Sequence, residues 1–237
     1  MSKPLAVLIT SGGMDSATLA YHYAAEGYDL HMVGFDYGQR HRKELSALAN
    51  VGNKLGAKVS VVDLTTLKQH LRGSSLTSED VNVPDGHYAE ETMRITVVPN
   101  RNAIMLSVAT GIAVAEKAEV VATGVHAGDH FIYPDCRPGF FEPFAKAMIE
   151  GNAGMGAAGL HLEAPFIAMT KAQIAELGTS LGVDYALTWS CYKGGDIHCG
   201  RCGTCVERIE AFLLAKVDDP TTYEETAFAL AEIERKS

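Results

Sequence analysis

Residues 9–19 read ITSGGMDSATL and mark the change from a buried strand to a helix. Ser11, Gly12, Gly13, Asp15 and Ser16 fall within six consecutive positions. A plain strand–helix turn, with Asp15 and Ser16 capping the helix, needs fewer glycines and fewer polar residues than this. Glycines let the backbone turn sharply and direct several N–H groups to one point, at the positive end of the following helix. The stretch therefore predicts a site for phosphate groups, with Mg²⁺ between Asp15 and the phosphates.

Strand-length apolar runs alternate with helix-length stretches along the chain. We expect strands at residues 5–10, 31–38, 58–64 and 118–125, and helices at 16–26, 41–55 and 102–117. Residues 67–97 are expected to form a long loop and 151–159 a connector. Helices are also expected from Pro138 to about residue 153, from 171 to 182 with Thr170 as N-cap, and from 221 to 236 after Asp219 and Pro220.

This alternation predicts an α/β fold with an open parallel sheet and helices on both faces. Functional residues should gather beyond the carboxyl ends of the strands, where such a sheet leaves its crevice. We expect two regions that form one functional unit: residues 1–185, a nucleotide-binding α/β domain, and residues 186–237, a cysteine-containing segment with helices.

Composition narrows the class of protein. The chain has 237 residues, is 47% hydrophobic and carries a formal net charge of −9. Its acidity disfavours a nucleic-acid partner, because phosphate-binding surfaces of that kind are basic; residues 39–43 form the one dense basic cluster. No apolar run approaches the roughly 20 residues that cross a bilayer, and the first apolar run is too short for a signal peptide. We expect a soluble cytoplasmic protein.

Four of the five cysteines lie within fifteen residues, in the spacing C-x7-C-x2-C-x2-C. In a cytoplasmic chain such clustering favours a metal over disulfides. Four thiolates fit one structural Zn²⁺, and an iron–sulfur cluster is the alternative. The expected ligands are Cys191, Cys199, Cys202 and Cys205. His198 is expected to be an ordinary exposed histidine and Cys136 a free thiol.

The hexad SGGMDS at residues 11–16 resembles the phosphate loop of the PP-loop ATP pyrophosphatases, SGGxDS. It lacks the Gly-Lys-Ser/Thr of a Walker motif and is not GxGxxG. The resemblance implies an adenine nucleotide alpha hydrolase-like fold. It also implies ATP, with Mg²⁺, as the molecule whose phosphates the loop holds, and adenylation of a carbonyl or carboxyl oxygen as the chemistry.

Further stretches resemble the 7-cyano-7-deazaguanine synthase family over nearly the whole chain. They are FDYGQRH (35–41), VPNRN (98–102), GVHAGDH (124–130), YPDCR (133–137) and the cysteine segment that begins TWSCY (188–192). The resemblance implies a C–N ligase that converts 7-carboxy-7-deazaguanine and ammonia to the nitrile through an adenylate and an amide, and it suggests a homodimer. One departure is Gly139, where an acidic residue is expected; Glu142 is the substitute we consider.

The resemblance and the chemistry of the side chains assign three groups of site residues. The expected catalytic residues are Asp15, Ser16, Arg101 and Lys171. The residues expected to bind ATP are Thr10, Ser11, Gly12, Gly13, Met14, Asp15, Ser16, Ala17, Thr18, Leu19, Ala20 and Asp36. The residues expected to contact the substrate are Tyr37, Gln39, Asn102, Asp129, Asp135 and Arg137.

Each assignment has a structural alternative. Arg101 and Asn102 can hold phosphate or cap the helix that begins there. Residues 36, 37 and 39 can line the crevice or form a solvated strand end, and the charges at 129, 135 and 137 can recognise the base or form surface ion pairs. Lys171 in the first turn of a helix opposes the helix dipole, which favours a functional role. His126 is expected to be a satisfied core histidine.

Three other functions stay open. A tRNA-thiolating or tRNA-amidinating PP-loop enzyme would need a basic surface, and a thiolating one a persulfide cysteine besides. A zinc-stabilised nucleotide-binding module without catalysis would not explain why polar residues follow several of the expected strands. An amidotransferase would need a Cys-His-Glu set for glutamine hydrolysis, and none is visible in the sequence, which favours free ammonia.

Overall fold

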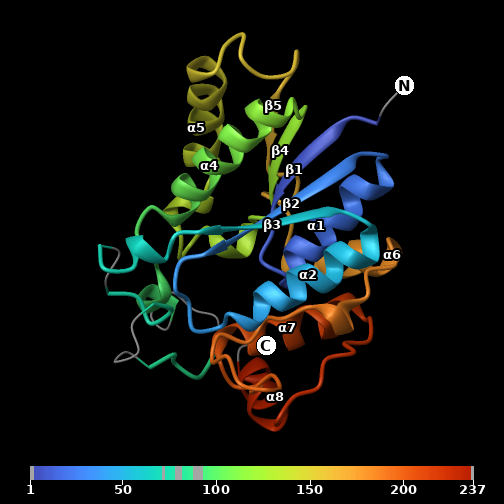
Figure 1. Ribbon diagram of the computed structural model, residues 1–237. Coiled ribbons are helices and arrows are strands. Elements are labelled where there is room, and N and C mark those ends of the chain that lie inside the picture. The colour runs from blue at the N-terminus through green and yellow to red at the C-terminus, as the bar shows by residue number, and fades with distance from the viewer. Residues whose placement is uncertain (1–2, 71–72, 78–81, 88–92, 236–237) are drawn as a thin grey trace.

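The computed structural model describes residues 3–70, 73–77, 82–87 and 93–235 (Figure 1). Its described part contains a sheet of five parallel strands in the order β3-β2-β1-β4-β5. The strands are β1 (Leu5–Ile9), β2 (Asp29–Asp36), β3 (Lys58–Asp63), β4 (Val120–Thr123) and β5 (His161–Glu163). In β1, Val7 pairs with His31 of β2 on one side and with Val121 of β4 on the other. The expected open parallel sheet is confirmed.

Helices connect these strands and continue beyond them. The α-helices are α1 (Met14–Ala25), α2 (Lys43–Leu55), α4 (Arg101–Glu116), α5 (Pro138–Gly151), α6 (Lys171–Ser180), α7 (Gly203–Ala215) and α8 (Ala227–Glu234). Single turns of 3-10 helix lie at Thr65–Leu67, Arg94–Thr96, Ala127–Asp129, Pro134–Cys136 and Tyr185–Leu187. No helix in the described ranges combines the length and apolarity needed to cross a membrane.

Helices cover both faces of the sheet because side chains of a strand alternate between its faces. Ala6 and Leu8 of β1 pack in one core with residues of α1, α2 and α6. Val7 points the other way, into a core with residues of α4 and α5. The order of strands reverses between β1 and β4, so the crevice opens at the carboxyl ends of these two strands.

Several expected boundaries hold. Thr170 caps α6 through a reciprocal pair of hydrogen bonds with Gln173. Pro138 is the first residue of α5, as its fixed φ favours. Gly56 ends α2 in the left-handed conformation.

Other expectations were wrong. The last helix begins at Ala227, not at residue 221. The carboxylate of Asp219 accepts hydrogen bonds from the buried Arg208, from the N–H of Thr221 and from Tyr223, and these contacts hold the segment before Ala227 outside a helix. The end expected for it at residue 236 lies outside the described residues. Two elements were missed: β5, which has only three residues, and α7, which begins directly after the second-last cysteine.

Candidate active site

A pocket lies where β1, β2 and β4 end. It is lined by residues that directly follow these strands, including Thr10, Tyr37 and Gly124. The predicted phosphate loop, residues 11–16, lies at one side of it, and Arg101, in the first turn of α4, lies at another. The sheet topology thus brings together polar segments that are far apart in the sequence.

The loop before α1 is held by one side chain. The Oγ atom of Ser16 accepts hydrogen bonds from the N–H groups of Ser11 at 3.2 Å and Gly12 at 3.1 Å, and donates to the carbonyl of Gly13 at 3.1 Å. Gly13 is the N-cap and has no side chain to cap the helix. The amino end of α1 therefore faces the pocket without a capping side chain, as an anion site requires.

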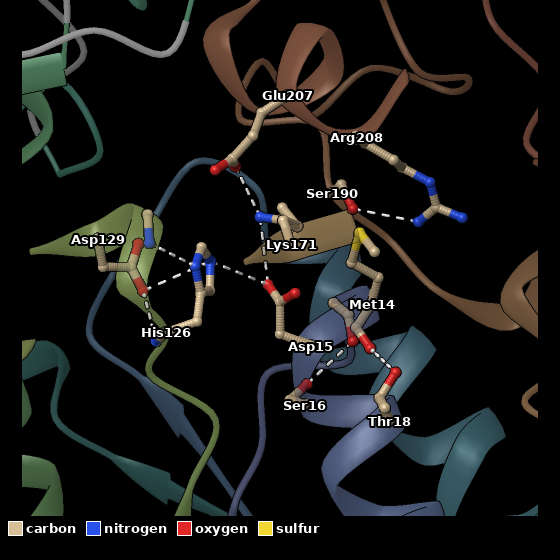
Figure 2. Close-up of polar contacts among 12 residues, drawn as sticks. Met14, Asp15, Ser16, Thr18, His126, Asp129, Lys171, Ser190, Glu207 and Arg208 are labelled. Carbon is tan, nitrogen blue, oxygen red and sulfur yellow. Dashed lines mark hydrogen bonds and ion pairs between the residues drawn. The ribbon is translucent and has the colours of Figure 1, made fainter. Parts of the chain in front are cut away.

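Asp15 and Lys171 meet in this pocket (Figure 2). The Nζ atom of Lys171 lies 3.2 Å from Oδ2 of Asp15 and 2.6 Å from Oε2 of Glu207 on α7. Burial opposes the charge of Lys171, but the carboxylates of Asp15 and Glu207 outweigh it and raise its pKa above the ordinary value. The site therefore holds a permanent ammonium group beside the phosphate loop.

Asp15 also has a free coordination position. Its Oδ1 atom is buried and has no hydrogen-bond partner among the described residues. A carboxylate oxygen of this kind is a ligand that Mg²⁺ prefers. The residues present thus fit a magnesium ion bound with the nucleotide.

His126 is buried, as expected. Its Nδ1 atom accepts a hydrogen bond from the N–H of Gly128 at 3.1 Å. Its Nε2 atom faces two carboxylates, at 3.9 Å from Asp15 and 3.6 Å from Asp129 (Figure 2). The backbone of its own turn satisfies Nδ1 of the histidine, and Nε2 adds a polar contact to the carboxylate of Asp15.

Three tyrosines lie around Arg101 on another wall of the pocket. Tyr37, Tyr133 and Tyr192 line the pocket with it, and the guanidinium carbon lies 5.6 Å from the centre of the Tyr133 ring. Burial raises the pKa of Tyr37 to about 12, although the Arg101 guanidinium opposes the shift. Among the described residues Arg101 forms no ion pair, so its charge is available to an anionic ligand.

The sequence did not single out Glu44 or His41, which also line the pocket. Glu44 lies in the first turn of α2, where an acidic residue is usual and attracts no attention. Tyr133, Tyr192 and Glu207 were missed as well. The stretch QRHRKE at residues 39–44 follows the end of a strand, and this position could have indicated that His41 and Glu44 lie near the pocket.

The other expected residues fall into two sets. Asn102 and Asp129 line the pocket with the loop residues Thr10, Ser11, Gly13, Met14, Asp15 and Ser16. Outside its lining lie Gly12, Ala17, Thr18, Leu19, Ala20, Asp36, Gln39, Asp135 and Arg137.

Of the residues outside the pocket lining, Asp135 contacts a lining residue, and Asp36 and Arg137 form contacts elsewhere. Asp135 accepts a hydrogen bond from the N–H of Asn102 at 3.1 Å and so caps α4. Asp36 binds Arg42 at 2.6 Å. Arg137 is exposed and donates to the carbonyl of His130 at 2.6 Å.

The structure decides one alternative at these positions. Residues 36, 37 and 39 are buried, so they are not a solvated strand end. Gly139 and Glu142 are both exposed and lie outside the pocket lining.

The four clustered cysteines are buried, and their sulfur atoms all lie within 4.8 Å of one another. The Sγ atoms of Cys199 and Cys205 are 3.9 Å apart. Tetrahedral zinc with bonds of about 2.3 Å separates its thiolates by about 3.8 Å, whereas an iron–sulfur cluster holds them farther apart. The donor set therefore fits one metal ion.

His198 is not the exposed histidine expected from the sequence. It is 5% exposed, because its ring packs 4.2 Å from that of Trp189 and its Nε2 atom accepts a hydrogen bond from the N–H of Ser190. Cys136 is a free thiol, as expected, but it is buried in the pocket wall, where Asn102 donates to its sulfur at 3.1 Å.

Comparison with known proteins identifies the family. A family model described as queuosine biosynthesis protein QueC matches residues 5–216. The chain belongs to the QueC family. It is 56% identical over 222 residues to a 7-cyano-7-deazaguanine synthase of Rhizobium rhizogenes, covering 94% of this chain and 93% of the relative. It is 53% identical over 231 residues to the synthase of that name from Brucella anthropi, covering 98% of each.

The solved structures that match the chain share far less of its sequence than these relatives do. An NMN synthetase from Francisella tularensis is 14% identical, with a TM-score of 0.47, over 99% of this chain and 83% of that one. The U34-tRNA thiolase NcsA from Methanococcus maripaludis is 15% identical, with a TM-score of 0.49, over 100% of this chain and 72% of that one.

Proposed function

We propose that the protein is a 7-cyano-7-deazaguanine synthase, a ligase that converts 7-carboxy-7-deazaguanine and ammonia to the nitrile with ATP. The name comes from the relatives that share more than half of its residues over nearly the full length. The observation that carries the ATP chemistry is the uncapped amino end of α1 in one pocket with Asp15, Lys171 and Arg101. The queuosine pathway is the setting that the family description supports.

The chemistry explains why ATP is needed. A carboxylate does not react with ammonia at neutral pH, because its oxygen is a poor leaving group. Transfer of AMP to that oxygen supplies a good one, and ammonia then gives an amide. A second activation, at the amide oxygen, permits elimination to the nitrile.

The chain's own residues suit the first activation. The N–H groups at the amino end of α1 and the ammonium of Lys171 would bind the phosphates. Asp15 would hold the Mg²⁺, which supplies positive charge to the phosphate oxygens when bound. Arg101 would bind the carboxylate or the charge that develops on the transferred phosphoryl group.

Zinc is the metal we propose for the four cysteines. The site has four thiolates and no open position, so its role is structural. Metal analysis of the purified protein is expected to give one zinc per chain without iron, whereas iron and acid-labile sulfide would contradict it.

We further propose that the protein acts in the cytoplasm as a homodimer on small molecules rather than on nucleic acid. The net charge of −9 supports the last point. Light scattering of the purified protein tests the dimer, and a gel shift with bulk tRNA tests for RNA binding.

The experiment for the activity is mass spectrometry of reactions with ATP, Mg²⁺, ammonium and 7-carboxy-7-deazaguanine. We expect the nitrile, with a transient amide, and no product from D15A. Zinc-loaded, folded protein that leaves ATP and the carboxylate unchanged would contradict the proposal and favour the tRNA-modifying alternative.

A further inference from the structure

Glu44 is a carboxyl group in the pocket that the proposed chemistry has not yet used. It projects from the first turn of α2 and is 9% exposed. Asp15 and Asp129 are the other carboxylates of the pocket lining. Asp15 pairs with Lys171, and Asp129 accepts a hydrogen bond from the backbone of His126.

The side chain of Glu44 is held in place by a second residue. Gln39 donates from Nε2 to Oε1 of Glu44 at 3.0 Å. Gln39 is itself fixed, because it also donates to the carbonyl of Phe35 at 3.0 Å and accepts from the N–H of Tyr37 at 3.0 Å. One carboxyl oxygen is therefore oriented, as a general base requires.

The groups that face Glu44 decide its protonation. Oε2 lies 3.4 Å from Nε2 of His41, a buried histidine whose pKa burial lowers to about 3 and which is therefore neutral. The hydroxyl of Tyr37 and the guanidinium of Arg101 are the other titratable groups close enough to act on it. Burial raises the pKa of Glu44 to about 8, with Gln39 and Arg101 opposing the shift. A base with a pKa near the working pH is the most effective kind.

We propose that Glu44 is the catalytic base that takes a proton from the nitrogen nucleophile. This inference rests on the proposed function, which requires an ammonium ion to become ammonia before it can attack. Glu44 is an oriented, buried carboxyl group in the same pocket as the phosphate loop, and no lysine or arginine forms an ion pair with it among the described residues.

The proton transfers balance. Ammonium gives one proton to the Glu44 carboxylate, and the nitrogen keeps the electron pair. That pair forms the C–N bond as the bond between the acyl carbon and the AMP oxygen breaks, with its electrons leaving on AMP. The nitrogen releases a second proton to the phosphate of AMP, whose second pKa is about 6, so the products are the amide, AMP and protonated Glu44.

Two partial reactions separate this role from ATP activation. Adenylation is measured by exchange of labelled pyrophosphate into ATP with the carboxylate substrate and no ammonium. Amide formation is measured by adding ammonium. We expect E44Q to keep the exchange rate within about threefold but to lose roughly 100-fold or more in amide formation, the usual range for a general base.

Further variants and conditions make the test specific. E44D retains the carboxylate and is expected to retain much of the amide step. E116Q, on α4 in an ion pair with Lys58 outside the pocket lining, is the control and should behave as wild type. Raising the pH supplies free ammonia, so E44Q should recover with pH, which a structural defect would not show.

The outcomes are distinct. Wild-type protein without exchange would contradict the proposed function itself. Normal amide formation by E44Q, or equal losses in exchange and amide formation, would overturn the role of Glu44. If E44Q does not fold, wild-type pH profiles at a constant concentration of ammonium ion decide. The amide step should rise and then level off above about pH 8, the pKa of Glu44, while exchange shows no such step. A continuous rise in proportion to free ammonia, or identical profiles for the two reactions, would overturn the proposal.

Discussion

Gly12 shows how tightly the phosphate loop packs. Its φ is +93°, and a Cβ atom there would lie 2.3 Å from the carbonyl oxygen of Glu44 and 2.5 Å from the N atom of Leu48. Both atoms belong to the backbone of α2, which cannot move as a flexible side chain would. At the next position, a Cβ on Gly13 would come no closer than 3.3 Å to any neighbouring atom, the Oγ atom of Ser11, and the φ there is −73°.

We therefore expect G12A to lower the free energy of unfolding by at least about 2 kcal/mol, from backbone strain and overpacking. G13A should lower it by less than about 1 kcal/mol. Urea unfolding of the two variants measures the difference. Equal stabilities would show that α2 and the loop separate easily.

Glu44 makes a second prediction at this scale, on stability rather than activity. Its pKa is about 8 in the folded protein, against about 4.3 for an unfolded glutamate. Because the folded pKa is raised, the folded state binds the extra proton. The contribution to stability is complete below about pH 4 and is lost as the pH rises through about 8.

E44Q remains neutral at every pH, so it should gain stability relative to the wild type between pH 5 and pH 9. The expected gain is on the order of 4 kcal/mol. Urea unfolding of both proteins at the two pH values measures it. A difference that stays constant with pH would mean that Glu44 titrates normally.

Among the elements, α7 links the cysteine cluster to the phosphate pocket. It begins at Gly203, between Cys202 and Cys205, and carries Glu207 to the ammonium of Lys171. Helix α6 presents Lys171 from its first turn, where the positive end of the helix would repel it without the two carboxylates. Two helices thus position Lys171: α6 carries it, and α7 supplies the carboxylate of Glu207 that binds it.

Removal of the Glu207 charge should take away the 2.6 Å ion pair that holds Lys171 from α7, while its ion pair with Asp15 remains. We expect E207Q to lose at least about tenfold in product formation, because a displaced group reduces the rate steeply. E210Q, on the same helix and paired with His87, is the matched control and should keep its activity. Equal activity of the two variants would show that Lys171 does not depend on Glu207.

In the whole molecule, the C-terminal segment, residues 186–237, packs on the part of the chain that contains the sheet. The N–H of Trp189 donates to the carbonyl of Gly12 at 2.9 Å. The fully buried guanidinium of Arg208 binds the carbonyl of Tyr185, and Phe212 lies in the same core as the strands. We propose that residues 1–185 and 186–237 unfold as one cooperative unit.

Metal removal tests this proposal with a spectroscopic signal. Trp189 is the single tryptophan of the chain and packs in the same core cluster as the four cysteines. Chelation under reducing conditions should shift its fluorescence to longer wavelength, lower the Tm and weaken ATP binding. Complete metal removal with unchanged ATP affinity would show that the two regions are independent.

Some features of this protein follow from neighbouring residues alone. The phosphate loop, the first three strands and their helices, the capping of α6 and the start of α5 could be predicted, because each depends on local periodicity, a cap or a glycine. The cysteine spacing likewise predicted that four cysteines lie together. The boundary of α8 could not be predicted, since it depends on the contact of Asp219 with the buried Arg208. The existence of α7 could not be predicted either, because the helix follows the cysteine segment without a capping signal.

The sequence by itself determined the α/β class, the glycine turn that leaves the amino end of α1 without a side-chain cap, and the cluster of four cysteines, because periodicity, backbone turns and residue spacing are local properties. Only the tertiary structure decided that His198 is buried, that Lys171 lies between Asp15 and Glu207, and that Glu44 faces the pocket with its oxygen fixed by Gln39. Burial, electrostatic pairing and proton affinity depend on groups brought together from distant parts of the chain, and the parallel sheet gathers those groups where its strands end.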